Sequence, residues 1–173
     1  VRMKKFIIVL FFSFLLPLSA EFLKKEVHFI VKHPFKTVHG KCKEVNIQEI
    51  EIDNNLTIKP FRITIPYLKM DTGNQNRDSH MLEVLGYPTY KEILVEINPV
   101  KIQENTTFEG WITIKGIRKP IKSIASIEKQ NNLYIVKGKA NIVLNEFQIE
   151  RPSLLGLAVE DLVEVNYEFI YKH

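Results

Sequence analysis

The segment Val163–Tyr171, which reads VEVNYEFIY, indicates most clearly how this 173-residue chain folds. Apolar or aromatic side chains occupy every second position, and mostly polar residues stand between them. A period of two places alternate side chains on opposite faces of a β-strand, so that one face meets a core and the other meets water. The segment therefore predicts a half-buried strand of an antiparallel sheet.

Similar alternation, filled by β-branched and aromatic residues, recurs along most of the chain after residue 20. Gly, Asn and Pro separate these segments, and Gln130-Asn131-Asn132 is typical of a hairpin turn. Each segment predicts one strand, about eight in all: Val27–Val31, Val45–Ile52, Phe61–Ile65, Ile93–Ile97, Ile112–Ile114, Ile121–Glu128, Leu133–Leu144 and Val163–Tyr171.

One segment departs from this pattern and predicts a short helix near residues 78–85. Asp78 or Ser79 can cap its first turn, and Gly86 suits its C-terminal end. Together the segments predict an all-β fold, an eight-stranded antiparallel up-and-down β-barrel with one short helix. The lumen of such a barrel is just wide enough for packed side chains or for one small ligand, and composition leaves both open.

The first twenty residues, VRMKKFIIVLFFSFLLPLSA, have the three parts of a secretory signal peptide. Three basic residues precede the apolar run Phe6–Leu16, and the segment ends in small residues at Ser19 and Ala20. The run is too short for a membrane anchor, which needs about 20 apolar residues. We therefore expect cleavage near Ala20, a periplasmic location, and a folded domain over residues 21–173.

Charge and cysteine content exclude several classes of protein. The chain has 24 Lys and Arg against 20 Asp and Glu, a net charge of +4, but residues 1–20 hold three of the basic residues and none of the acidic ones. The remaining chain is close to neutral, and no basic cluster predicts nucleic-acid binding. Cys42 is the single cysteine, so an intramolecular disulfide and every multi-cysteine metal site are excluded.

The predicted inward faces are rich in Phe, Tyr, Ile and Val. They either pack solid or line a cavity for an apolar ligand. The lumen candidates, taken from strand parity and from the apolar face of the helix, are Phe29, Val31, His33, Phe35, Phe61, Ile63, Ile65, Leu82, Leu85, Ile112, Ile114, Phe147, Val165, Tyr167 and Phe169. Near the helix start, Arg77, Asp78 and His80 form either a structural network or a site for a ligand head group at the barrel mouth.

The chain offers few catalytic or metal-binding patterns. Asp71-Thr72-Gly73 matches the short signature of aspartic proteases, but that chemistry needs a second carboxylate and no second copy exists, so we interpret it as a turn. The histidines lack metal-ligand spacing, and we expect no metal and no cofactor. One alternative is an enzyme acting on a small amphiphile, with His33 or His80 as its acid–base group. Another is a ligandless stress or interaction protein that pairs through Cys42.

The order of several motifs resembles the YceI-like family, also described as polyisoprenoid-binding periplasmic proteins. The opening strand VHFIVKH at 27–33 is similar to that of the family, as are Arg77-Asp78-Ser79-His80 at the helix start and Tyr87-Pro88 after it. GWITIKGIRKPI at 110–121 resembles the family pattern G-x-L-x-I-x-G-x-x-K-P-V.

The resemblance covers nearly all of residues 27–171. It implies a lipocalin-like barrel whose lumen holds a long isoprenoid or a similar amphiphile, and it implies no established catalysis. Transient contact with a membrane and a homodimer are both left open by the sequence.

Overall fold

The structure is a computed structural model that describes residues 20–173, so the predicted signal peptide lies outside the described residues except for its last one. Its strands are β1 Glu21–His33, β2 Lys36–Cys42, β3 Asn46–Ile47, β4 Thr57–Ile58, β5 Phe61–Pro66, β6 Met70–Asp71, β7 Glu92–Ile97, β8 Val100–Lys101, β9 Asn105–Ile114, β10 Ile117–Gln130, β11 Leu133–Val143, β12 Ser153–Leu154, β13 Leu157–Ala158 and β14 Leu162–Lys172. Its helices are the 3-10 turns η1 Tyr67–Lys69 and η2 Leu144–Phe147 and the α-helix α1 Gln75–Val84.

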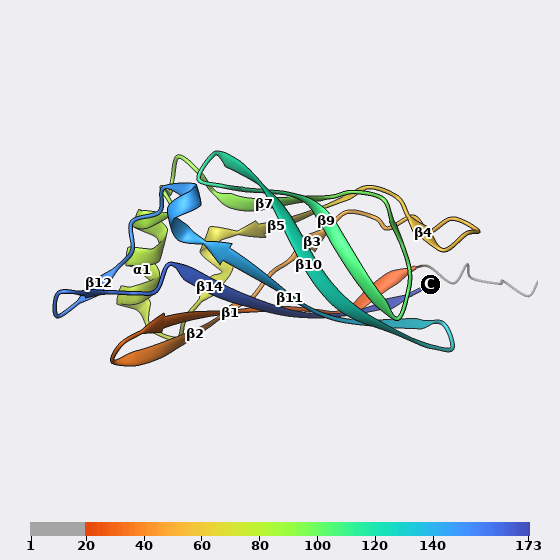
Figure 1. The fold of residues 1–173 in the computed structure, drawn as a ribbon, viewed down its shortest axis with the longest axis horizontal. Helices are drawn as coiled ribbons and strands as arrows, with labels where there is room; N and C mark the ends of the chain where they lie inside the picture. Colours follow the sequence, from red (N-terminus) through yellow and green to blue (C-terminus); the bar gives the residue numbers. More distant parts are fainter. Residues whose placement is uncertain (1–19) are drawn as a thin grey trace, which may run out of the picture.

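Ten strands form one curled antiparallel sheet in the order β3-β5-β7-β9-β10-β11-β14-β1-β2-β6 (Figure 1). The long strands follow one another in chain order, and the last strand, β14, pairs with the first, β1. The fold is therefore all-β with up-and-down connections, as the alternation predicted. Pairing the first strand with the last joins the two halves of the chain within one sheet.

The two ends of this sheet meet along a kinked seam. The chain through β2 and β3 runs antiparallel to the chain through β5 and β6: Cys42 pairs with Met70, and Ile47 pairs with Ile63. Between these pairs the Lys43 N–H donates to the carbonyl oxygen of Lys69 at 2.7 Å. Counting each of the two stretches as one strand, the ten strands make a ring of eight.

The strand predicted over Val45–Ile52 is shorter than expected, because only Asn46–Ile47 pair in the main sheet. After these residues the chain leaves the ladder, and Ile50 and Ile52 instead pack as loop residues against the hydrophobic core. The hairpin at Gln130-Asn131-Asn132 is confirmed, since Gln130 pairs with Leu133 across a two-residue turn.

The helix α1 begins three residues earlier than predicted. Its N-cap is Asn74, whose side chain accepts a hydrogen bond from the Arg77 N–H at 3.0 Å. Neither Asp78 nor Ser79 caps it, because both lie inside the helix. It ends at Val84 with Leu85 as its C-cap, and Gly86 follows with a φ of +80°, the left-handed conformation predicted for this position. Figure 1 shows α1 at one end of the barrel, the end that also carries the β12–β13 hairpin.

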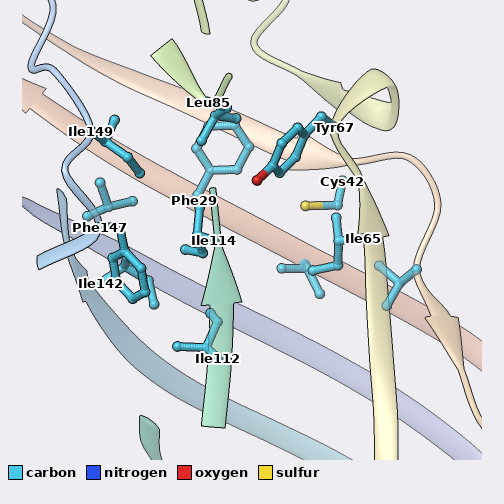
Figure 2. Packing of buried hydrophobic residues seen from close by; sticks show 13 residues of the cluster. Phe29, Cys42, Ile65, Tyr67, Leu85, Ile112, Ile114, Ile142, Phe147 and Ile149 are labelled. Atoms are coloured by element: carbon cyan, nitrogen blue, oxygen red, sulfur yellow. The ribbon is translucent and has the colours of Figure 1, made fainter. Parts of the chain in front are cut away.

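Two clusters of buried hydrophobic residues stabilise the barrel interior. The larger includes Phe29, Cys42, Tyr67 and Leu85, and Figure 2 shows its labelled members lying close together between the strands. The second includes Phe108, Ala125, Tyr134 and Tyr171. In the described part of the chain, no helix is both long and apolar enough to cross a membrane.

Two aromatic rings each lie over a glycine of the neighbouring strand. The ring of Phe29 covers Gly40, where an added Cβ would stand 2.1 Å from the ring. The Tyr167 ring covers Gly138 in the same way, at 2.2 Å. Glycine at both positions therefore lets a large ring lie flat against the inner wall of the barrel.

Candidate functional site

The barrel interior holds a cavity of about 370 Å³. Its wall draws inward-facing side chains from the long strands of the ring and from α1, and almost all of them are apolar. This volume falls in the range of roughly 300–1,000 Å³ that is common for small-molecule sites. The lumen is therefore not filled by its own side chains, which was one of the two outcomes that composition left open.

The burial pattern of the strands shows where this space lies. Along β9 exposed and buried residues alternate almost without exception, as expected against a packed core. Along β14 the inward residues Val165, Tyr167 and Phe169 stay partly accessible, although they point into the barrel. These three side chains face the cavity and are not covered by other side chains. The empty space therefore lies against β14.

Most of the lumen residues expected from strand parity lie on the cavity wall. These are Phe29, Val31, Phe61, Ile63, Ile65, Leu85, Ile112, Ile114, Val165, Tyr167 and Phe169.

Phe35 was placed in the lumen wrongly, because its side chain is 58% exposed. It follows Pro34 in the turn between β1 and β2, and the turn ends the alternation on which its placement rested. His33 is buried but does not line the cavity. Its Nδ1 accepts the Phe35 N–H at 3.1 Å, so Nε2 carries the proton and donates to the Leu157 carbonyl at 2.8 Å. His33 thus joins the β1–β2 turn to the β12–β13 hairpin.

Two further lumen candidates lie beside the cavity and not on its wall. Leu82 packs against the larger core cluster from the helix. Phe147 is 2% exposed within that cluster and belongs to η2. Both are apolar contacts that close the barrel end around the cavity.

Several wall residues were not among the candidates. Phe108 and Tyr171 share the parity of predicted inward residues, so the alternation already contained the signal for them. Phe22 could not be found this way, because a register shift between Phe22 and Lys24 reverses the parity of β1. Ile50 and Ile102 line the cavity from loops that have no periodic pattern.

We place the opening of the cavity beside α1, because the most exposed part of its wall lies there. Among the described residues that line it, His80 is the one classed as exposed, and Thr72 and Arg77 line the same part of the wall. His80 Nδ1 lies 3.4 Å from Glu83 Oε2 on the next turn of the helix. Asp78 does not reach the wall, because its Oδ1 accepts from the N–H and the Oγ1 of Thr72, at 3.0 and 2.5 Å.

Arg77 is held in place at this opening by Thr72. Its Nε donates to Thr72 Oγ1 at 2.9 Å, and its Nη2 donates to the Thr72 carbonyl at 2.7 Å. Within residues 20–173 no carboxylate lies at ion-pair distance from the guanidinium. The opening of an apolar cavity therefore carries an oriented positive charge that no carboxylate contacts directly, and the Asp78 carboxylate lies one hydrogen bond farther, on Thr72 Oγ1.

The wall also contains Cys42 and a pair of hydroxyl groups. Burial raises the pKa of the Cys42 thiol to about 12, so the thiol stays protonated and unreactive at neutral pH. Burial also raises the pKa of Tyr167, although its hydrogen bond to Ser123 opposes this. The hydroxyl groups of Tyr167 and Ser123 lie 2.6 Å apart.

The segment Asp71-Thr72-Gly73 forms a turn. Asp71 Oδ1 accepts the Gly73 N–H at 2.8 Å, and Lys43 lies 3.0 Å from Oδ2. These two contacts hold the pKa of Asp71 below its usual range. In the part of the chain that the structure describes, no three His, Cys, Asp or Glu residues gather as a metal site would require.

A curled antiparallel barrel, one capping helix and an apolar cavity in the lumen define a lipocalin-like fold. The family model of the YceI-like domain matches residues 23–171, and the chain belongs to this family. No curated protein matches the chain.

Solved structures share this fold. BcnA of Burkholderia cenocepacia superposes with a TM-score of 0.74 at 15% identity, covering 84% of this chain and 95% of its own. A polyisoprenoid binding domain from Saccharophagus degradans, implicated in plant cell wall breakdown, gives 0.68 at 12% identity, covering 88% and 97%. The Campylobacter jejuni YCEI protein gives 0.63 at 22% identity, covering 80% and 86%. At these identities the likeness shows the fold.

Proposed function

We propose that this protein binds a long apolar ligand of the isoprenoid class in the barrel lumen. The observation that carries the proposal is the cavity of about 370 Å³ with its almost wholly apolar wall. Membership of the YceI-like family supports it, and so does the Saccharophagus degradans relative, which is described as polyisoprenoid binding.

The driving force is the removal of hydrocarbon from water. Each methylene that enters the lumen contributes about 0.8 kcal/mol, so a chain of several isoprene units gains enough to offset the cost of immobilising it. The wall needs no directional contacts along the chain, because this force follows buried area and not geometry.

The head group of the ligand lies at the opening beside α1. Arg77 supplies an oriented guanidinium there, and a guanidinium suits a phosphate or a carboxylate. His80 is exposed on the same part of the wall. Asp78 contributes indirectly, because it fixes Thr72, which in turn holds Arg77.

We further propose that the protein is exported and that its role is periplasmic transport or storage of the ligand. The support is the signal-peptide pattern of residues 1–20. Mass spectrometry of the protein recovered from the periplasm tests this, and we expect a mature N-terminus at Glu21. Recovery only of an unprocessed cytoplasmic chain would contradict it.

We propose no catalytic role. The two ring nitrogens of His33 are both engaged with main-chain groups, and its ring does not reach the cavity. His80 lines the opening, but its described neighbour within hydrogen-bond distance is the exposed Glu83.

Titration with a long polyprenol tests ligand binding directly. Ala140 lines the cavity, and the next residue, Asn141, is exposed on the outer face of the same strand. Ala140→Phe therefore fills the lumen, whereas Asn141→Phe adds the same ring outside it. We expect Ala140→Phe to weaken binding at least about tenfold, a loss of 1.4 kcal/mol or more. Equal affinities for the two variants would contradict a ligand in the lumen.

A further inference from the structure

Two turns bring exposed apolar side chains together at one end of the barrel. Phe35, in the β1–β2 turn, is 58% exposed, and Leu154, Leu155 and Leu157 of the β12–β13 hairpin are 45%, 81% and 44% exposed. We call these four residues the apolar tip. His33 fixes the turns to each other, because its Nε2 donates to the Leu157 carbonyl and its ring lies 5.3 Å from the Phe35 ring.

The apolar tip lies at the same end as the cavity opening. Figure 1 shows α1 and the β12–β13 hairpin together at this end. Pro152 and Val159, which flank the hairpin, line the cavity, as does Val38 just after the β1–β2 turn. A surface that the tip contacts is therefore close to the entrance of the lumen.

Leu155 occupies a backbone conformation that does not suit leucine. It has a φ of +53° and is followed by Gly156 at +79°, the pair of positive values that a two-residue hairpin turn of type I′ needs. Asn-Gly is the favoured pair in such a turn, and a bulky residue there costs stability. A leucine that is both strained and 81% exposed does not stabilise the fold, which points to a contact of its side chain with another molecule.

The charged residues within the two turns are basic, whereas the exposed Glu150 and Glu160 border the hairpin at its base. Residues 33–39 and 151–159 contain Lys36 and Arg151 and no Asp or Glu. Neither basic residue has an ion-pair partner among the described residues. Exposed apolar side chains flanked by unpaired cations match the interface of an anionic bilayer, where apolar groups enter the acyl boundary and cations meet the head groups.

We propose that the apolar tip docks the protein onto an anionic lipid bilayer, with the cavity opening next to the membrane surface. Two narrow projecting turns suit a deformable lipid surface. The proposed function enters this inference only as the purpose of docking, which would let an apolar ligand pass from the bilayer into the lumen without crossing water. Docking itself is measured with vesicles that contain no isoprenoid.

The test uses a fluorophore that reports its local environment on the full chain. It is attached at Ser153→Cys beside the tip or at Asn55→Cys near β4, which Figure 1 shows at the far end of the barrel. Cys42 does not compete for the label, because it is buried and its pKa is raised to about 12. With vesicles of phosphatidylcholine and phosphatidylglycerol, we expect a blue shift of the emission at position 153 and none at position 55.

A matched pair of variants separates docking from folding. Leu155→Asn suits the left-handed turn, so we expect it to keep or raise stability against urea while it abolishes the blue shift. Leu56→Asn is the control, because Leu56 is also exposed, at 45%, with a φ of +58°, but lies near β4. We expect the Leu56→Asn variant to keep the shift.

Three results would overturn the proposal. The first is an unchanged emission at position 153 with anionic vesicles, and the second is a shift that survives Leu155→Asn. The third is a shift that appears without vesicles and grows with protein concentration, which would make the tip a contact between copies of the chain. A blue shift in a protein that takes up no polyprenol would sustain docking and reject the proposed function.

Discussion

The hydroxyl group of Tyr167 donates its proton to Ser123 Oγ, 2.6 Å away on the cavity wall. The direction of this hydrogen bond follows from the other contact of Ser123, because the Ser123 hydroxyl donates its proton to the Lys139 carbonyl at 2.8 Å. The two donors are therefore satisfied within the wall, and neither is free for a ligand. A wall built this way presents hydrocarbon to the lumen although it contains hydroxyl groups.

Tyr167→Phe tests this arrangement. It removes one donor while Ser123 keeps its bond to Lys139, so we expect a loss of about 1 kcal/mol in the free energy of unfolding in urea. Ser123→Ala, which leaves the buried Tyr167 hydroxyl without its acceptor, should cost more. Affinity for an uncharged polyprenol should be unchanged in Tyr167→Phe. A loss of about tenfold or more would show that the hydroxyl contacts the ligand instead.

Arg77→Gln distinguishes the head of the ligand from its chain. The substitution removes the positive charge at the opening but leaves the apolar wall intact. We expect affinity for a polyprenyl phosphate to fall about tenfold and affinity for the matching polyprenol to stay the same. Arg118→Gln, on the outer face beside Glu96, is the control. Equal losses for the two ligands would reject a head-group role for Arg77.

His33→Ala should weaken the fold and spare the site. It removes an acceptor for the Phe35 N–H and a donor to the Leu157 carbonyl, so we expect a loss of about 2 kcal/mol in urea. Polyprenol binding should persist, because His33 does not line the cavity. His39→Ala is the control, since His39 is exposed on the adjoining strand. If binding were lost at unchanged stability, the proposed structural role would be wrong.

Alkaline pH should destabilise the barrel through its buried acids. Burial raises the pKa values of Tyr67, Tyr167 and Tyr171, and that of Cys42 to about 12. Groups whose pKa is raised by folding contribute stability that is complete below their unfolded pKa, about 8.5 for Cys and about 10 for Tyr. The contribution is lost as pH rises through the folded pKa, so stability should fall above about pH 8.5.

Urea unfolding at stepped pH measures this loss. Of these four groups, Cys42 is the first to lose its proton in the unfolded chain as the pH rises. The stability of the Cys42→Ala variant should therefore stay nearly level between about pH 8.5 and pH 10, where only Cys contributes strongly. Identical slopes for Cys42→Ala and the parent protein in that interval would show that the thiol is not buried as described.

Strand parity predicted much of the fold and of the cavity wall. Val165, Tyr167 and Phe169 could be placed inside from the sequence, because β14 pairs with β11 along its whole length without a register shift. The end of α1 was also predictable, since Gly86 supplies the left-handed residue that ends it.

The remaining features depend on contacts that periodicity does not contain. The turn at Pro34 and the register shift after Phe22 both interrupt alternation, so Phe35 was misplaced and Phe22 was missed. The role of His33 depends on Leu157, 124 residues away in the chain. No local pattern reports such a partner.

Native mass spectrometry of the purified protein, prepared without detergent, tests the central claim most directly. The account predicts a complex heavier than the chain, whose extra mass is extracted by organic solvent and identified as an isoprenoid. Asn141→Phe should retain the ligand, and Ala140→Phe should lose it. A protein that has the mass of the bare chain and takes up no polyprenol on incubation would contradict the account.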